Sequence, residues 1–307
     1  MSVPSLYGRY ILISPVKDEE KFVEVTIQAV LKQTVRPERW IIVDDGSRDK
    51  TSQIVERYAR ENEWIKVLRI DGAAVRLPGP GVIRAFNAGY QLIGDTDFDF
   101  LVKLDCDLDF SDDYFEQLLR KFQGDKTLGI ASGLCVEKSR DGWHPSSGPE
   151  YHAFGASKMV RAKCFNEIGG FLPSRGWDTI DEIRAQMAGW RTCHVKELPL
   201  YHLKPEGSGM GFMRTHMMHG EIFYLTGGGA VFFLLKVGHR MLFGKPVLLG
   251  GWAMFYGYLR ARVFKNKKLV TKAEAQFYRH TLNDRIWHGF VRVFIRNRDK
   301  KTMLGVN

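Results

Sequence analysis

The chain has 307 residues, 44% of them hydrophobic and 26% charged, so it can bury a large core and is not a disordered protein. Its four cysteines include no Cys-x-x-Cys pair, and no signal peptide precedes the first apolar run, which favours a reduced, cytoplasmic protein over a secreted disulfide scaffold. The net charge of +10 is concentrated near the C-terminus, which predicts an anionic partner for that part.

The first half of the chain alternates apolar strands with helical patterns, which predicts an α/β fold with a parallel sheet. Three predicted strands end in acidic residues. These ends are Tyr10–Val16 before Asp18 and Glu19, Trp40–Val43 before Asp44 and Asp45, and Leu101–Leu104 before Asp105 and Asp107. Ligands of open α/β sheets bind beyond the carboxyl ends of the strands, so we expect these acids at the site.

Asp105 and Asp107 are one residue apart, and such a pair can hold a divalent cation and a ribose together. We predict that Asp107 is a metal ligand and that Asp105 binds the ribose or shares the ion. Mn²⁺ or Mg²⁺ suits carboxylate and phosphate oxygens. An Asp-x-Asp pair also occurs in surface turns, but the adjacent Asp44 and Asp45 support a site, because they repel each other unless a ligand or cation uses them.

Further elements follow in chain order. We expect helices and strands over Phe22–Gln33, Ser52–Asn62, Gly81–Gly89, Ser111–Phe122 with Ser111 as its cap, Leu128–Val136, Thr179–Ala188 and Thr192–Glu197. Residues 138–151 are rich in Gly, Pro and Ser, and we expect a loop that covers the site and contributes to acceptor specificity.

The order and spacing of these motifs resemble family 2 glycosyltransferases. The segments that carry the resemblance are Pro15–Glu19, Val43–Ser47, Gly81–Gly89, Asp105–Asp107, Ile168–Phe171, and Trp177–Glu182 with Gly189-Trp190. The resemblance covers roughly residues 9–205. It implies a GT-A fold, with a Rossmann-like, mostly parallel sheet flanked by helices, and a nucleotide-sugar donor.

The resemblance also implies roles for single residues. Asp45 looks like the residue that binds the nucleobase, with uracil and hence a UDP-sugar favoured. Arg84 reaches the phosphates or is only a solvated helix arginine, and His202 completes the metal site or is structural. The implied nucleotide-binding set is Pro15, Glu19, Asp45, Arg84 and Asp105, with Glu19 on the ribose side, and the implied metal ligands are Asp107 and His202.

The catalytic base is expected at the start of the helix after Trp177. Counting back from Arg184 and Gly189 aligns Asp178 with the base of the family, but Trp177 replaces the usual glutamate, so Asp181 stays an alternative. Asp178 can also be the N-cap of the helix. One carboxylate acting on the acceptor, without a second nucleophile, predicts inversion at the anomeric carbon.

From Pro205 the composition changes, so we predict a catalytic domain at 1–205 and a basic helical region at 206–307. From Lys236 onward 16 basic residues stand against three acidic ones, whereas the rest has 29 basic and 32 acidic residues. Two apolar runs, Ile222–Leu235 and Val247–Leu259, are shorter than the roughly 20 residues that span a bilayer.

The two runs are core helices, or else interfacial helices or a re-entrant hairpin. We favour an anionic membrane surface as partner, at the inner face of the cell membrane. In that interpretation the headgroup-level residues are Trp252, Tyr256 and Tyr258, with Arg260, Arg262, Lys265, Lys267 and Lys268 on phospholipid. Nucleic acid is disfavoured as partner, because the strand ends are acidic.

The predicted function is transfer of one sugar to a hydroxyl of a glycan or lipid-linked acceptor, in envelope or exported polysaccharide assembly. The Gln-x-x-Arg-Trp motif of processive synthases is absent after Asp178. One alternative is a nucleotidyltransferase acting on a sugar phosphate, although the first strand lacks its glycine-rich loop. The other is a catalytically inactive nucleotide-sugar-binding module.

Overall fold

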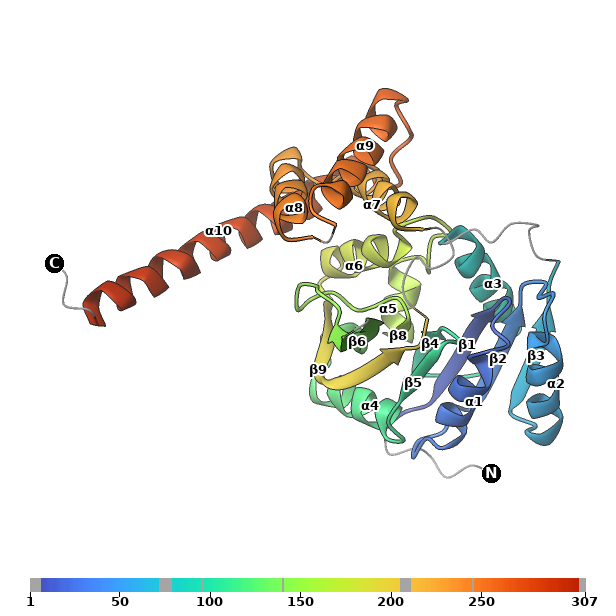
Figure 1. Cartoon of the computed structure of the whole chain (residues 1–307). Coiled ribbons are helices and arrows are strands. Elements are labelled where there is room, and N and C mark those ends of the chain that lie inside the picture. The colour runs from blue at the N-terminus through green and yellow to red at the C-terminus, as the bar shows by residue number, and fades with distance from the viewer. Residues whose placement is uncertain are drawn as a thin grey trace. The chain divides into compact units, whose positions relative to one another are not determined.

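The computed structural model describes residues 7–71, 79–94, 96–139, 141–204, 211–244 and 246–303, with side chains as far as residue 287. The chain divides into two compact units, Met1–Ser208 and Gly209–Asn307. Their helices and strands are labelled in Figure 1. The predicted domain boundary between residues 205 and 206 lies outside the described residues.

The first unit contains a nine-stranded sheet of order β3-β2-β1-β4-β8-β6-β9-β5, with β7 paired to β6. The neighbouring strands β1 to β4 are parallel, as predicted. Beyond β4 the sheet is mixed, because β8 runs antiparallel to β4 and β6, and β5 antiparallel to β9. The strands are β1 Tyr10–Val16, β2 Arg39–Asp44, β3 Ile65–Arg69, β4 Phe100–Leu104, β5 Leu108–Phe110, β6 Leu128–Ser139, β7 Gly142–Pro145, β8 Ser157–Arg161 and β9 Arg191–His202.

Both faces of the sheet are buried, and the period of two along β1 assigns its side chains to them. Tyr10 and Leu12 belong to one hydrophobic cluster, whereas Ile11 and Ile13 belong to a second one. The first cluster includes residues of α1 (Val23–Leu31), α2 (Thr51–Glu61) and α4 (Tyr114–Gly124). The second includes residues of α3 (Pro80–Gln91), α5 (Ala162–Glu167) and α6 (Trp177–Met187).

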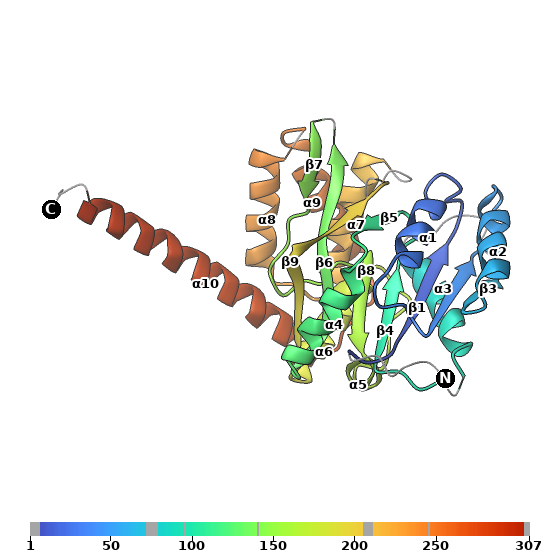
Figure 2. The same ribbon diagram turned by 90° about the horizontal axis from the view of Figure 1, so that it is seen from below.

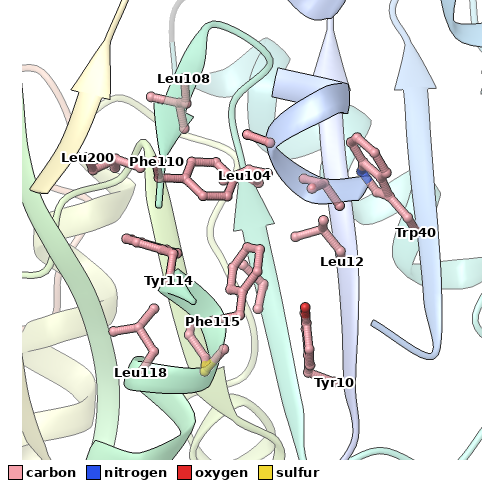
Figure 3. Close-up of a cluster of buried hydrophobic side chains, with 14 of the residues drawn as sticks. Tyr10, Leu12, Trp40, Leu104, Leu108, Phe110, Tyr114, Phe115, Leu118 and Leu200 are labelled. Carbon is pink, nitrogen blue, oxygen red and sulfur yellow. The ribbon is translucent and has the colours of Figure 1, made fainter. Parts of the chain in front are cut away.

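Aromatic rings fill the first cluster. Figure 3 shows Tyr10, Leu12 and Trp40 from two strands facing Leu104 and Phe115 from β4 and α4. The ring centroids of Tyr10 and Phe115 are 5.1 Å apart. This packing places the carboxyl ends of β1, β2 and β4 side by side, because the three strands are adjacent and parallel.

Two local predictions are wrong. Ser111 does not cap a helix: α4 begins at Tyr114 with Asp113 as N-cap, and the Ser111 hydroxyl donates to the Asp113 carboxylate instead. Residues 138–151 are not all loop, because β6 extends to Ser139 and pairs with β7 in a hairpin (Figure 2). Gly142 has a φ of +129°, which allows the tight reversal between these two strands.

The second unit is helical, with α7 (Phe212–Leu225), α8 (Ala230–Phe243), α9 (Leu249–Val263) and α10 (Lys272–Met303). The predicted run 222–235 is not one helix. It forms the end of α7 and the start of α8, because Gly227 adopts a φ of +75° between them. The run 247–259 lies mostly in α9.

Helices α7 and α9 approach each other at two glycines. A Cβ added to Gly220 would lie 1.9 Å from the Met254 carbonyl oxygen, and one added to Gly257 would lie 2.0 Å from the Met217 carbonyl oxygen. Only glycine allows this backbone contact. The small core of the unit contains Phe223, Phe233, Val237, Met254 and Leu282.

The second unit also exposes many large apolar side chains. Among those at least 44% exposed are Val231, Leu234, Leu235, Leu242, Phe243, Val247, Leu248, Leu249, Trp252, Tyr256, Leu259, Val263 and Phe264. Tyr258 was predicted at headgroup level together with Trp252 and Tyr256. Unlike those two exposed residues, its ring stacks on Phe233 inside the unit, with the ring centroids 4.2 Å apart. Within the part of the chain that the structure describes, no helix has the length and apolarity that crossing a membrane requires.

Candidate active site

Asp44 and Asp45, at the end of β2, have different environments. Asp44 is buried, and its carboxylate accepts hydrogen bonds from the Ser47 backbone N–H at 2.8 Å and from the Ser52 hydroxyl. Its negative charge therefore stabilises the turn into α2, and no ligand is needed to explain it. Asp45 remains partly exposed, with its Oδ2 3.7 Å from Lys17 Nζ, and is available to a ligand.

Pro15 and Glu19 lie at the end of β1. Pro15 is buried in register with Val43 of β2. The Glu19 backbone N–H donates to Thr51 Oγ1 at 2.8 Å, and Lys204 Nζ donates to its buried carboxylate at 2.7 Å. The structure therefore places Glu19 beside the expected nucleotide site, with its charge already compensated by a lysine.

Arg84 is exposed on α3, and no hydrogen bond or ion pair joins it to the residues that the structure describes. Residues 72–78, immediately before α3, lie outside the described residues. The two predicted alternatives for Arg84, phosphate contact and solvation, thus remain.

Asp105 follows β4 and is held by a buried lysine. Lys103 Nζ donates to Asp105 Oδ1 and to the Gly155 carbonyl oxygen, both at 2.6 Å. The Asp105 backbone N–H also donates to the Ala156 carbonyl at 2.8 Å. These bonds join the end of β4 to the segment that leads into β8, and they fix one edge of the site.

Asp107 and His202 are brought together by the backbone. Leu108 of β5 pairs with His202 of β9, and the Leu203 N–H donates to the Asp107 carbonyl at 2.8 Å. As a result Asp107 Oδ2 lies 3.3 Å from His202 Nε2.

Each residue of this pair changes the charge state of the other. Burial disfavours the charged form of the imidazole, but hydrogen bonds with Asp107 and Cys135 raise the pKa of His202 to about 11. Burial likewise opposes the carboxylate, and the hydrogen bond with His202 outweighs it, so the pKa of Asp107 lies below its usual range. The pair is therefore an ionised carboxylate beside a protonated imidazole, and a cation bound by both residues would replace that proton.

A divalent cation fits this pair. A carboxylate oxygen and an imidazole nitrogen 3.3 Å apart offer donors that Mn²⁺ accepts. Asp105 fits a metal less well, because Lys103 already occupies one of its oxygens. Asp107 with His202 is thus a better set of metal donors than Asp105.

The three acids at the start of α6 differ in their partners. Asp181 is fully buried, and both of its carboxylate oxygens lie 3.0 Å from Lys158 Nζ. Glu182 accepts a hydrogen bond from the Ala153 N–H at 2.7 Å, and its Oε1 lies 3.0 Å from His152 Nδ1. The Asp178 carboxylate has no hydrogen-bond or ion-pair partner in the described part of the chain, and the residue is half-buried.

Asp178 is not the N-cap of α6, so the predicted capping role is wrong. Gly176 is the N-cap, with a φ of +73°, and Asp178 is the second residue of the helix. A Cβ at Gly155 would lie 3.5 Å from Asp178 Cβ and 3.6 Å from its Oδ2. Because the Gly155 carbonyl also accepts from Lys103, which binds Asp105, both Asp178 and Asp105 lie near Gly155.

Lys158 and Lys103 were not identified from the sequence. Lys158 is fully buried in β8 and donates to the Asp178 carbonyl at 3.0 Å as well as to Asp181. Burial alone would lower its pKa, but Asp181, Glu182 and Asp178 together raise it. A lysine inside an apolar strand was the available signal, because buried lysines require acidic partners.

The chain is similar to a known protein family over the part that contains the three acidic strand ends. The model of the family described as glycosyl transferase family 2 matches residues 11–176, which is more than half of the chain. The chain belongs to glycosyl transferase family 2. The match covers β1 to α5 and therefore includes the three acidic strand ends.

Individual relatives agree with this family. EpsH of Bacillus subtilis (strain 168), a protein named as a glycosyltransferase, is 30% identical over 126 residues, which are 41% of this chain and 33% of EpsH. The chain thus spans about a third of the length of that curated relative.

Two solved structures share the fold. The mannosyltransferase PcManGT of Pyrobaculum calidifontis, in complex with GDP-Man and Mn²⁺, has a TM-score of 0.54 at 13% identity, over 99% of this chain and 89% of that one. S. aureus TarS 1–349 in complex with UDP-GlcNAc has a TM-score of 0.53 at 16% identity, over 88% and 78% of the two chains. The predicted GT-A fold is thereby confirmed.

Proposed function

We propose that this chain is an inverting, metal-dependent glycosyltransferase that moves one sugar from a nucleotide-diphosphate sugar to a hydroxyl acceptor. Family membership supports a sugar transfer. The observation that carries the proposal is the environment of Asp178. Of the three acids at the start of α6 it alone keeps a carboxylate without a partner in the described structure, and Gly155 lies near both it and the Lys103–Asp105 pair.

In this mechanism Asp178 accepts the proton of the acceptor hydroxyl as that oxygen attacks the anomeric carbon. Asp181 and Glu182 cannot share this task, because Lys158 and the Ala153 N–H already hold their carboxylates. With one unpaired carboxylate among the described acids at the start of α6, the displacement occurs in one step and inverts the anomeric centre.

The donor side is assigned to the three strand ends. Asp45 binds the nucleobase, and Asp105, held in place by Lys103, binds the ribose. Pro15, Glu19 and Arg84 complete the nucleotide surface. Asp107 and His202 would hold a divalent cation, Mn²⁺ or Mg²⁺, and its charge would compensate that of the diphosphate leaving group. The UDP-GlcNAc bound to TarS and the GDP-Man and Mn²⁺ bound to PcManGT support a nucleotide-sugar donor, and we favour a UDP-sugar.

The experiment that tests the donor site is a thermal-shift measurement with nucleoside diphosphates, with and without Mn²⁺, because a ligand of the native state raises its melting temperature. Asp107→Ala should abolish the Mn²⁺-dependent part of the stabilisation. Asp109→Ala, an exposed acid two residues along, is the matched control and should retain it. Full Mn²⁺-dependent stabilisation of Asp107→Ala would show that Asp107 is not a ligand, and tight binding without turnover would indicate an inactive binding module.

We also propose that the C-terminal unit, residues 206–307, binds the inner face of the cell membrane and brings the enzyme to a glycan or lipid-linked acceptor. Exposed Trp252 and Tyr256 on α9 support an interfacial role, whereas Tyr258 packs inside the unit and does not share it. Exposed basic residues lie close by on the same unit, namely Arg260, Arg262, Lys265, Lys267 and Lys268. The proposed setting is envelope or exported polysaccharide assembly.

A further inference from the structure

A second group of metal-ligand side chains lies beside His202. Cys135 Sγ, a carboxylate oxygen of Glu137 and a ring nitrogen of His202 all lie within 4.8 Å of one another. Cys135 is buried, and Glu137 and His202 are half-buried. No part of the proposed transfer mechanism uses Cys135 or Glu137.

The register of the sheet builds this group. In the parallel pair β6–β9, Glu137 is the partner of His202 and Cys135 is the partner of Leu200. Residues two apart on a strand face the same side of the sheet, so Cys135 and Glu137 share one face. Cys135 Sγ and a ring nitrogen of His202 accordingly lie within 4.8 Å of each other. The backbone, rather than chance side-chain rotation, therefore keeps the three residues together.

We infer that Cys135, Glu137 and His202 form a binding site for a thiophilic divalent cation such as Zn²⁺. Thiolate, imidazole and carboxylate are the three ligand types that Zn²⁺ accepts. With Zn–S bonds of about 2.3 Å and Zn–N and Zn–O bonds of about 2.0–2.2 Å, the ligand atoms of a tetrahedral ion lie roughly 3.3–3.7 Å apart. The ligand atoms of the trio, all within 4.8 Å of one another, lie close to this spacing.

Binding would be coupled to loss of two protons. The Cys135 S–H proton and the imidazolium proton of His202 would both leave for solvent as sulfur and nitrogen bind the ion, and water would complete the coordination. This donor set contains a thiolate, whereas Asp107 with His202 does not. Because thiolates favour Zn²⁺ over Mn²⁺ or Mg²⁺, the two sets prefer different cations.

Because both donor sets use His202, the two cations compete. Occupancy of the thiol site by Zn²⁺ should weaken Mn²⁺-dependent nucleotide binding, and it makes the enzyme sensitive to free zinc. The site itself does not depend on the proposed function, since Zn²⁺ binding requires neither nucleotide nor sugar.

The test uses tag-free, full-length protein without nucleotide. Co²⁺ serves as the spectroscopic probe, because a thiolate ligand produces a sulfur-to-cobalt charge-transfer absorption that added Zn²⁺ removes by displacement. Zn²⁺ affinity is measured in parallel by calorimetry. Cys135→Ser should abolish the absorption and weaken Zn²⁺ binding by at least the roughly 10–100-fold that loss of an outer-shell partner costs.

Two further variants make the result specific. Cys193→Ser, the matched control, removes a half-buried thiol of β9 outside the trio and should leave the absorption and the Zn²⁺ affinity unchanged. Glu137→Gln keeps the buried thiol in place and should weaken Zn²⁺ binding while retaining the absorption.

A charge-transfer absorption that survives Cys135→Ser would show that another thiol binds the ion, and it overturns the assignment. Should Cys135→Ser lose its fold, as circular dichroism would reveal, Glu137→Gln decides the question. An unchanged Zn²⁺ affinity in that variant overturns the site.

Discussion

At the scale of single residues, Asp178, Asp181 and Glu182 show how differently neighbouring carboxylates can be used. All three lie in the first two turns of α6. Lys158 and the backbone of residue 153 hold two of them, and only Asp178 keeps a free carboxylate among the described residues. The proposal of Asp178 as the base therefore rests on the pairing of its neighbours as well as on its spacing from Arg184 and Gly189.

Asp178→Asn is expected to leave donor binding intact and to lower turnover by about 10²–10⁴-fold, because general-base catalysis contributes on that order. The measurement is kcat with a nucleotide sugar and acceptor, beside the Mn²⁺-dependent thermal shift of the same preparation. Asp181→Asn is the comparison. If Asp181→Asn were inactive at full stability while Asp178→Asn kept its activity, the base would be Asp181.

Lys158→Met is expected to reduce the free energy of unfolding by about 3–5 kcal/mol, because removing one partner of a buried ion pair leaves a buried charge uncompensated. Lys158→Met with Asp181→Leu should recover much of this loss, since it removes both charges. Urea unfolding of the two variants and the wild type measures the difference. A double variant no more stable than Lys158→Met would show that Lys158 does not act through Asp181.

At the scale of elements, patterns within one strand or helix predicted β1, β2, β4 and α2 well. Their apolar runs and capping turns lie within a few residues of one another, so the signal is local. The run 222–235 was harder, because hydrophobicity alone does not show that Gly227 turns the chain between α7 and α8. The short β5 was also missed: its three residues gain their strand conformation from pairing with β9.

Gly257→Ala is expected to destabilise the C-terminal unit by about 1–3 kcal/mol or more, since the new methyl group meets the Met217 carbonyl of α7. Gly238→Ala in α8 is the matched control. A Cβ there meets no atom within 4 Å, so this change should stabilise the helix by roughly 0.5–1 kcal/mol. Thermal unfolding followed by circular dichroism distinguishes the two. Equal melting temperatures would show that the α7–α9 contact is not close.

At the scale of the whole molecule, charge and exposed apolar surface differ between the two units of the chain. The basic residues are concentrated after Lys236, and large exposed apolar side chains lie on α8 and α9. Each Lys or Arg near an anionic bilayer contributes about 1 kcal/mol, and the apolar surface adds to it. The acidic strand ends all lie in the other unit.

Full-length protein should therefore sediment with anionic vesicles at low salt and partition less as salt rises, because the Debye length is about 8 Å at physiological ionic strength. Trp252→Ser, which removes a 59% exposed ring, should weaken sedimentation. Trp143→Ser, a change at a 40% exposed tryptophan of β7, is the control and should not. Protein that stays in the supernatant at low salt would contradict the membrane proposal.

The positions of the acidic strand ends, the family that they resemble and the start of the basic segment can all be read from the amino-acid sequence alone. These features depend on residues close together in the chain, so periodicity, turn residues and composition reveal them. Tertiary structure decided which acids are free. Asp181 is held by Lys158, 23 residues earlier, and Glu19 by Lys204, 185 residues later. Burial and pairing over such separations arise only when the sheet assembles, because a strand pattern does not specify which distant side chain will neutralise a buried charge.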